Sequence, residues 1–127
     1  SRYPKIRWCF AHGGGSFAYT FGRIRHGWQC RPDLVAVDQP DDPRGALGRF
    51  WVDTLLHEPA ALQMALDSFG PDKLAVGSDY PFPLGESEPG KLVRSMPWPD
   101  DLKQAILFDN ALAWLGLTPQ LQRLVVP

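Results

Sequence analysis

The sequence lacks the features that define several large classes of protein. It has only two cysteines, Cys9 and Cys30, among 127 residues. This argues against a small domain held together by disulfides and favours a reducing compartment such as the cytoplasm. No apolar run approaches the roughly 18 residues of a membrane span, and the first residues lack the pattern of a signal peptide. We therefore expect a cytoplasmic protein with no membrane partner.

An excess of charge of one sign is also absent. The sequence has 13 lysines and arginines and 14 acidic residues, interspersed along the chain, for a formal net charge of −1. A nucleic-acid-binding domain would need a basic face or stripe, so no nucleic-acid partner is expected. Hydrophobic residues make up 44% of the sequence, which is enough for one domain with a buried core.

Apolar strands alternate with amphipathic helices along the chain. The segment Trp8–Ala11 is apolar at every position, as is typical of a parallel strand covered on both faces. Strands that alternate with helices imply right-handed crossovers and a parallel sheet, so the predicted fold class is α/β. The residue pattern predicts strands at 5–12, 49–57 and 72–81, helices at 16–28, 58–70, from about 91, and 99–117, and a long loop at 31–48.

The last polar residues of the three predicted strands are His12, His57 and Asp79. Because the carboxyl ends of parallel strands meet at one edge of the sheet, where ligands bind, we expect these three residues to lie close together. His12 and Asp79 are candidates for acid–base or metal chemistry. The alternatives are a structural histidine, an Asx turn at Asp79, and a His57 that only begins the next helix.

Three glycines, Gly13–Gly15, follow His12 directly. A phosphate cradle is one interpretation, because N–H groups at a helix N-terminus attract anions. The Lys-Ser/Thr of a P-loop and the spacing of a dinucleotide-binding loop are both missing, however. The other interpretations are a turn that opens a metal or acid–base site to its ligand, and a tight turn without function. On the following helix, Arg23 could hold a substrate carboxylate bidentately or face solvent.

Two segments, "FAHGGGSFAYTFGRIRHGW" at 10–28 and "GSDYPFPLGE" at 77–86, carry a resemblance to a known family. The chain resembles the metal-dependent decarboxylases of the amidohydrolase superfamily, in particular those that act on carboxymuconate semialdehydes, over nearly all of its length. The resemblance implies a distorted (β/α)8 TIM barrel of the metal-dependent hydrolase type. This chain would supply about the last three βα units and the C-terminal helices. Residues 1–127 would then form a single partial domain, without the N-terminal strands of the barrel.

The resemblance also implies roles for individual residues. Asp79 matches the carboxylate that binds the catalytic zinc, and His12 matches the acid–base histidine beside it. Arg23 matches an arginine that reaches the substrate carboxylate in the neighbouring subunit, which implies a functional homodimer. Phe82 matches an aromatic wall of the pocket, while His57 stays a possible site residue with no implied role.

The implied Zn²⁺ site is completed outside this chain. The family also uses a His-x-His pair and a further histidine on earlier strands, and the sequence contains no His-x-His. The implied activity is the zinc-dependent, non-oxidative decarboxylation of a carboxymuconate-semialdehyde-like dicarboxylic substrate, with Gly13–Gly15 leaving space for the ligand. The alternatives are another metal-dependent hydrolase or an aromatic acid decarboxylase of this superfamily, and a non-catalytic fragment. The 127 residues alone are expected to be inactive.

Overall fold

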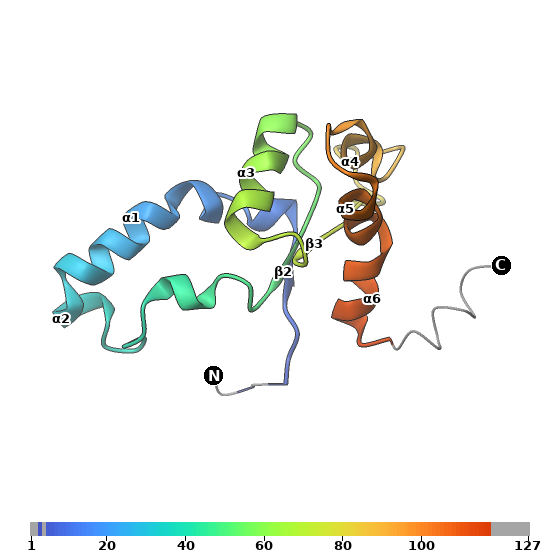
Figure 1. Ribbon diagram of the computed structural model, residues 1–127. Coiled ribbons are helices and arrows are strands. Elements are labelled where there is room, and N and C mark those ends of the chain that lie inside the picture. The colour runs from blue at the N-terminus through green and yellow to red at the C-terminus, as the bar shows by residue number, and fades with distance from the viewer. Residues whose placement is uncertain (1–2, 4, 118–127) are drawn as a thin grey trace.

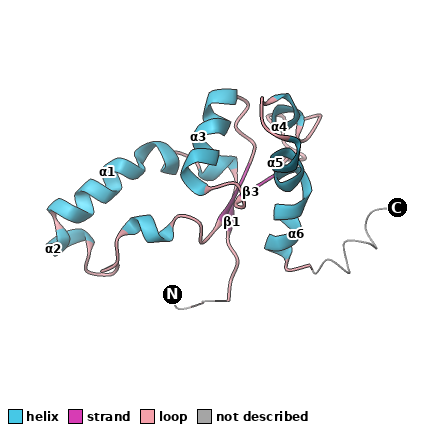
Figure 2. Ribbon diagram, viewed as in Figure 1, coloured by secondary structure: helices cyan, strands magenta, loops and turns pink. Residues whose placement is uncertain are grey.

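A short parallel sheet organises the protein. The computed structural model describes Tyr3 and residues 5–117. Its strands are β1 (Cys9–Phe10), β2 (Trp51–Asp53) and β3 (Leu74–Ala75), in the order β1-β2-β3, and both pairs are parallel. Helices connect successive strands, so the α/β class predicted from the sequence is confirmed (Figure 1 and Figure 2).

Helices make up most of the regular structure. In Figure 1, α3 and the stretch from α4 to α6 flank the strands, while α1 and α2 extend away from them. Among the described residues, no helix has the length and apolar character needed to cross a membrane. The helices are α1 (Phe17–Cys30), α2 (Pro32–Val35), α3 (Pro59–Phe69), α4 (Lys91–Ser95), α5 (Asp100–Gln104) and α6 (Asn110–Leu115).

The two long helices agree with the sequence prediction. α3 begins at Pro59, whose fixed φ suits the first turn of a helix. It ends before Gly70, which adopts a φ of 94°, and it buries Leu62 and Phe69 on one face. The bounds of α1 lie within two residues of the predicted ones at each end. The helical spacing of apolar residues was therefore a sufficient signal for both elements.

The core lies on one face of the sheet. Val52 and Leu74 are lateral neighbours in the parallel register and therefore share a face. Both are fully buried, and they belong to one cluster with Leu62 of α3 and Ile106 of the segment after α5. The alternation of side chains along a strand turns the intervening residues to the opposite face. These residues are Cys9, Trp51, Asp53 and Ala75.

The strands are shorter than the sequence predicts, with two or three paired residues each. The expectation that Trp8–Ala11 is covered on both faces is wrong, because Trp8 is 51% exposed and Phe10 is 46% exposed. The reason is that β1 is an edge strand, which among the described residues pairs only with β2. Its apolar side chains are therefore covered on one side of the strand only.

Two other predicted elements differ in detail. The segment 31–48, predicted as a loop, contains α2 and a 3-10 turn at Pro43–Ala46, and both begin with a proline. The predicted helix 99–117 is helical from α5 to α6 but contains a π-helical turn at Ala105–Asp109. A π-helical turn holds more residues than an α-helical turn, so it changes which residues of α6 face the sheet.

Asn110, the first residue of α6, ties this helix to the edge of the sheet. Its side-chain Nδ2 donates hydrogen bonds to the carbonyl oxygens of Leu74 at 2.8 Å and Pro71 at 2.7 Å. The residue is 6% exposed, and in the part of the chain that the structure describes β3 pairs with a strand on one side only. The amide therefore gives buried backbone carbonyls at the edge of the sheet the partner that they need.

Replacement of Asn110 by alanine is expected to lower the free energy of unfolding by about 1–3 kcal/mol, because both carbonyls lose their donor. Urea denaturation of the intact gene product measures this loss. Gln104→Ala, at an exposed position of α5, is the control and is expected to change stability by less than about 0.5 kcal/mol. An equal effect of the two substitutions would contradict the role given to Asn110.

Candidate active site

Three residues that follow the strands share a rare backbone conformation. His12, His57 and Asp79 have φ values of 55°, 56° and 55°, and they are the non-glycine residues with positive φ in the described part of the chain. A side chain in this left-handed region costs about 1–3 kcal/mol, and such strain concentrates at functional sites. The strained residues are the same three that the sequence singles out at its predicted strand ends.

The structure brings His12 and Asp79 together. Nε2 of His12 lies 3.5 Å from Oδ1 of Asp79, and their side chains are 60% and 23% exposed. His12 follows β1 and Asp79 follows β3, so the contact spans the carboxyl end of the sheet. An accessible imidazole can act as a general acid or base, and a neighbouring carboxylate can orient it. The pair therefore suits acid–base chemistry.

The same two side chains fit part of a divalent-metal site. Imidazole nitrogen and carboxylate oxygen are donors that zinc accepts, and catalytic zinc sites use three protein ligands. Within the described residues, no group of three or more histidine, cysteine or acidic side chains is placed to hold a metal ion. A complete site would therefore need ligands from outside this chain.

His57 lines a hollow of about 460 Å³ together with residues of the segment 85–95, and neither His12 nor Asp79 contributes to that hollow. A contact is thus found for two of the three candidates, His12 and Asp79, and His57 stays a possible site residue. β2 ends at Asp53, four residues before His57, and β3 ends at Ala75, four residues before Asp79, so both predicted strands are too long.

Asp53 is a site residue that the sequence analysis misses. Its Oδ1 accepts a hydrogen bond from the N–H of Gly13 at 2.9 Å. Its Oδ2 lies so close to Gly77 that a Cβ there would stand 2.6 Å away. Asp53 therefore lies between the turn after β1 and the segment that leads to Asp79. The signal that could have found it is an acidic residue inside the apolar run "FWVDTLL".

Cys9 lies on the same face of the sheet as Asp53. Burial raises the pKa of the Cys9 thiol, and the negative charge of Asp53 raises it further. The thiolate is the nucleophilic form of cysteine. Cys9 therefore stays protonated at neutral pH and is not a candidate nucleophile.

The three glycines serve the backbone turn and the packing of the core. Gly13, Gly14 and Gly15 have φ values of 59°, 75° and 63°, which glycine adopts without a steric penalty. A Cβ on Gly13 would lie 2.5 Å from Leu56, and one on Gly14 would lie 3.1 Å from Val52. The expectation that the glycines leave space for a ligand is therefore wrong for Gly13 and Gly14, while Gly15 faces open space.

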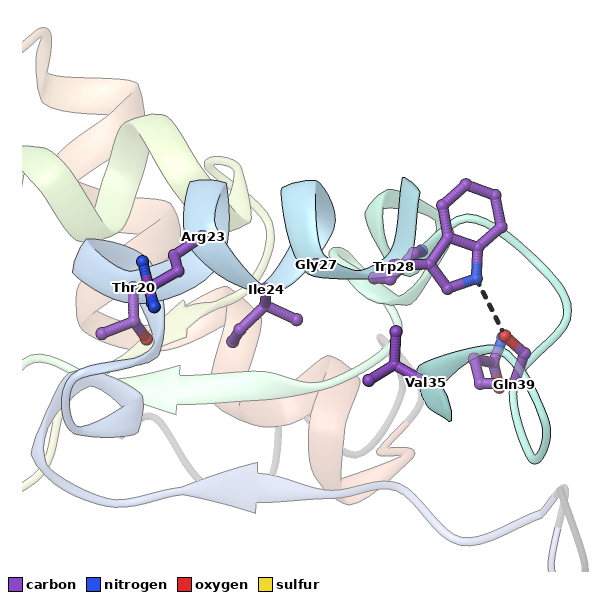
Figure 3. Close-up of a pocket in the computed structure, with 8 residues that line it drawn as sticks. Thr20, Arg23, Ile24, Gly27, Trp28, Val35 and Gln39 are labelled. Atoms are coloured by element: carbon purple, nitrogen blue, oxygen red, sulfur yellow. Dashed lines mark hydrogen bonds between the residues drawn. The ribbon is translucent and has the colours of Figure 1, made fainter. Parts of the chain in front are cut away.

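Arg23 lies on α1, outside the His12–Asp79 pair. Its exposed side chain lines a hollow of about 500 Å³ between α1 and the segment after it (Figure 3). Trp28 and Gln39 lie at the far end of this hollow, where Trp28 Nε1 donates a hydrogen bond of 3.1 Å to the Gln39 carbonyl. The structure thus does not bring Arg23 to the strand-end residues of its own chain.

Phe82 lies in the loop that follows Asp79. Its N–H donates a hydrogen bond of 2.8 Å to the carbonyl oxygen of Asp79, so the two residues share one tight turn. The side chain of Phe82 is 64% exposed. The turn therefore keeps an accessible aromatic ring close in the chain to the carboxylate.

Comparison with known proteins gives the family. A family model described as amidohydrolase matches residues 1–117. The chain belongs to the amidohydrolase family. It is 50% identical over 119 residues to the 2-amino-3-carboxymuconate-6-semialdehyde decarboxylase of Dictyostelium discoideum, and 39% identical over 120 residues to the protein of that name in Caenorhabditis elegans. These matches cover 93% and 94% of this chain, but 33% and 30% of the relatives. The chain therefore spans about a third of the length of these curated relatives.

A solved structure shares the fold of this amidohydrolase-family chain. It is the 5-carboxyvanillate decarboxylase of Novosphingobium aromaticivorans, in complex with manganese and 4-hydroxy-3-methoxy-5-nitrobenzoic acid. The TM-score is 0.74 at 19% sequence identity, and the match covers 91% of this chain and 34% of that one. The likeness at this identity concerns the fold alone.

Gly13→Ala is expected to lower the free energy of unfolding by about 2–4 kcal/mol, since it adds both backbone strain and a clash with Leu56. The control is the same substitution in a Leu56→Ala background, which removes the side chain that the added Cβ would meet. The expected loss there, relative to Leu56→Ala alone, is about 1 kcal/mol, from the left-handed backbone of Gly13. Urea denaturation of both variants of the intact gene product compares them. Equal losses would contradict the packing role of Gly13.

Proposed function

We propose that this chain forms about the last three βα units and the C-terminal helices of a distorted (β/α)8 barrel, as one partial domain over residues 1–127. The complete protein would be a zinc-dependent, non-oxidative decarboxylase of a carboxymuconate-semialdehyde-like dicarboxylic substrate. The observation that carries this proposal is the contact of 3.5 Å between His12 Nε2 and Asp79 Oδ1 at the carboxyl end of the sheet. The names of the two curated relatives support decarboxylation as the reaction.

In this proposal, Asp79 binds the metal together with ligands from outside the chain. A divalent cation held there would supply Lewis-acid chemistry: it would stabilise negative charge on the substrate and lower the pKa of a neighbouring water. The resemblance of the sequence implies zinc, and the manganese in the related solved structure supports a divalent ion in general.

His12 moves the proton that decarboxylation requires. When the bond between the substrate carbon and its carboxylate breaks, the electron pair of that bond stays on the substrate carbon, and carbon dioxide leaves. That carbon must take up a proton, which the imidazole of His12 donates as a general acid. The exposure of the His12 ring leaves it accessible to a substrate.

Arg23 and Phe82 bind the substrate in this proposal. The planar guanidinium of Arg23 would pair bidentately with a substrate carboxylate. Because α1 extends away from the strands (Figure 1), that carboxylate would lie in the site of the other subunit of a homodimer. Phe82 would form an aromatic wall next to Asp79. The two free cysteines support a cytoplasmic location.

Substitutions of His12 and Asp79 separate proton transfer from metal binding. In the intact gene product, His12→Ala is expected to keep the metal and to lower the decarboxylation rate by about 100-fold or more. Asp79→Ala is expected to lose both metal and activity, because Asp79 alone of the two is proposed as a ligand. Elemental analysis gives the metal per chain, and release of carbon dioxide gives the rate.

His26→Ala on α1 and Asp67→Ala on α3 are the matched controls, since both side chains belong to exposed contacts outside the site. Both variants are expected to keep metal and activity. Equal loss of metal in His12→Ala and Asp79→Ala would remove His12 from the acid–base role. An intact gene product that releases no carbon dioxide from any dicarboxylic substrate of this class would refute the proposed reaction.

Arg23→Ala is expected to lower kcat/KM by a factor that corresponds to about 2–5 kcal/mol, because a desolvated carboxylate of the substrate loses its partner. Metal content and fold are expected to stay unchanged. Arg31→Ala, which removes an exposed arginine paired with Asp33, is the control. Mixing the Arg23→Ala and His12→Ala proteins should restore part of the activity, since one site of the hybrid dimer then has both residues. If subunits exchange and no activity returns, the shared-site model is wrong.

A further inference from the structure

Asp53 contacts the backbone on both sides of the His12–Asp79 pair. It ends β2, the central strand of the sheet. Its Oδ1 accepts the N–H of Gly13 at 2.9 Å and the N–H of Leu55 at 3.2 Å. In the proposed function, Asp53 is neither the metal ligand nor the proton donor. Its carboxylate accepts the N–H of Gly13, the residue next to His12.

The hydrogen bond from Gly13 to Asp53 stabilises a turn whose residues all have positive φ. His12 has a φ of 55°, and the three glycines after it also have positive φ. A non-glycine residue keeps this conformation only when its surroundings hold it. Gly13 is buried, and its N–H meets a carboxylate, which forms stronger hydrogen bonds than a neutral acceptor. This bond fixes the peptide group between His12 and Gly13, and hence the direction in which the imidazole leaves the backbone.

The other carboxylate oxygen of Asp53, Oδ2, lies against the backbone between β3 and Asp79. A Cβ on Gly77 would lie 2.6 Å from Oδ2 and 2.8 Å from the Cβ of Asp53. Gly77 therefore allows the backbone before Asp79 to pass directly against the Asp53 side chain. One carboxylate is thus in contact with both backbone segments that present the His12–Asp79 pair.

We infer that Asp53 is a positioning residue for His12, which acts by holding the turn 12–15 through the N–H of Gly13. The inference rests on the proposed function, because the orientation of His12 matters to the rate only if His12 transfers the proton. A displacement of about 1 Å at a reacting group can lower a rate by about 100-fold. Loss of this hydrogen bond therefore affects turnover more than substrate binding.

The test compares three variants of the intact gene product at a temperature at which all are folded. Asp53→Ala removes the acceptor, and Asp53→Asn keeps an oxygen that can accept the N–H groups of Gly13 and Leu55. Asp67→Ala, which removes an exposed carboxylate of α3 that accepts from Gln63, is the matched control. The measurements are kcat, KM, metal per chain, and hydrogen–deuterium exchange of the peptide that covers 10–17.

Asp53→Ala is expected to lower kcat at least tenfold, to change KM less than threefold, and to leave the metal content unchanged. Exchange in the segment 12–15 should become faster. Asp53→Asn should return kcat to within about threefold of the parent protein and restore slow exchange, while Asp67→Ala should match the parent in every measurement. A residue that only contributes to stability would not give this split between kcat and KM in folded protein.

Three results would overturn the inference. They are a kcat of Asp53→Ala within twofold of the parent, unchanged exchange in the segment 12–15, and an Asp53→Asn protein as impaired as Asp53→Ala. Failure of the proposed function is distinguishable, because the parent protein itself would then show no decarboxylation. In that case the exchange data still decide whether Asp53 holds the turn, since unchanged exchange in Asp53→Ala contradicts it without any activity measurement.

Discussion

Parallel pairing of β2 with both β1 and β3 is the constraint on which the rest of the structure depends. Parallel strands end at the same edge of the sheet, so the residues that follow them meet there. His12 and Asp79 follow the two outer strands and approach within 3.5 Å across the end of β2. The register of these few hydrogen-bonded residues also puts Val52 and Leu74 on the face that α3 covers. One short sheet thus fixes both the core and the site.

The backbone at the site is strained, and neighbouring side chains hold it in this conformation. His12 and Asp79 hold positive φ values, which the chain would leave if it were free to relax. The buried side chain of Val52 lies against the turn of glycines, and the Asp53 carboxylate binds an N–H of that turn. Gly13 and Gly14 thus connect the site to the core, because both pack against core side chains.

One edge of the molecule is rich in exposed apolar side chains. A hollow of about 830 Å³ runs beside β1 and is lined by Trp8, Phe10 and Phe50, among others. Exposed apolar patches of this kind mark interaction surfaces or ligand-binding grooves. In the barrel that we propose, β1 would pair at this edge with a further strand.

The sequence by itself determined the α/β order, the two long helices and the residues His12 and Asp79, because apolar periodicity and strand-end polarity are local patterns. It did not fix the length of β2, because the apolar run continues past Asp53, the last paired residue of that strand. It missed Asp53 because a carboxylate that accepts the N–H of Gly13, 40 residues away, has no local signature. The need for glycine at positions 13 and 14 also comes from the tertiary structure. The packed core places Leu56 and Val52 next to the positions that a Cβ would occupy.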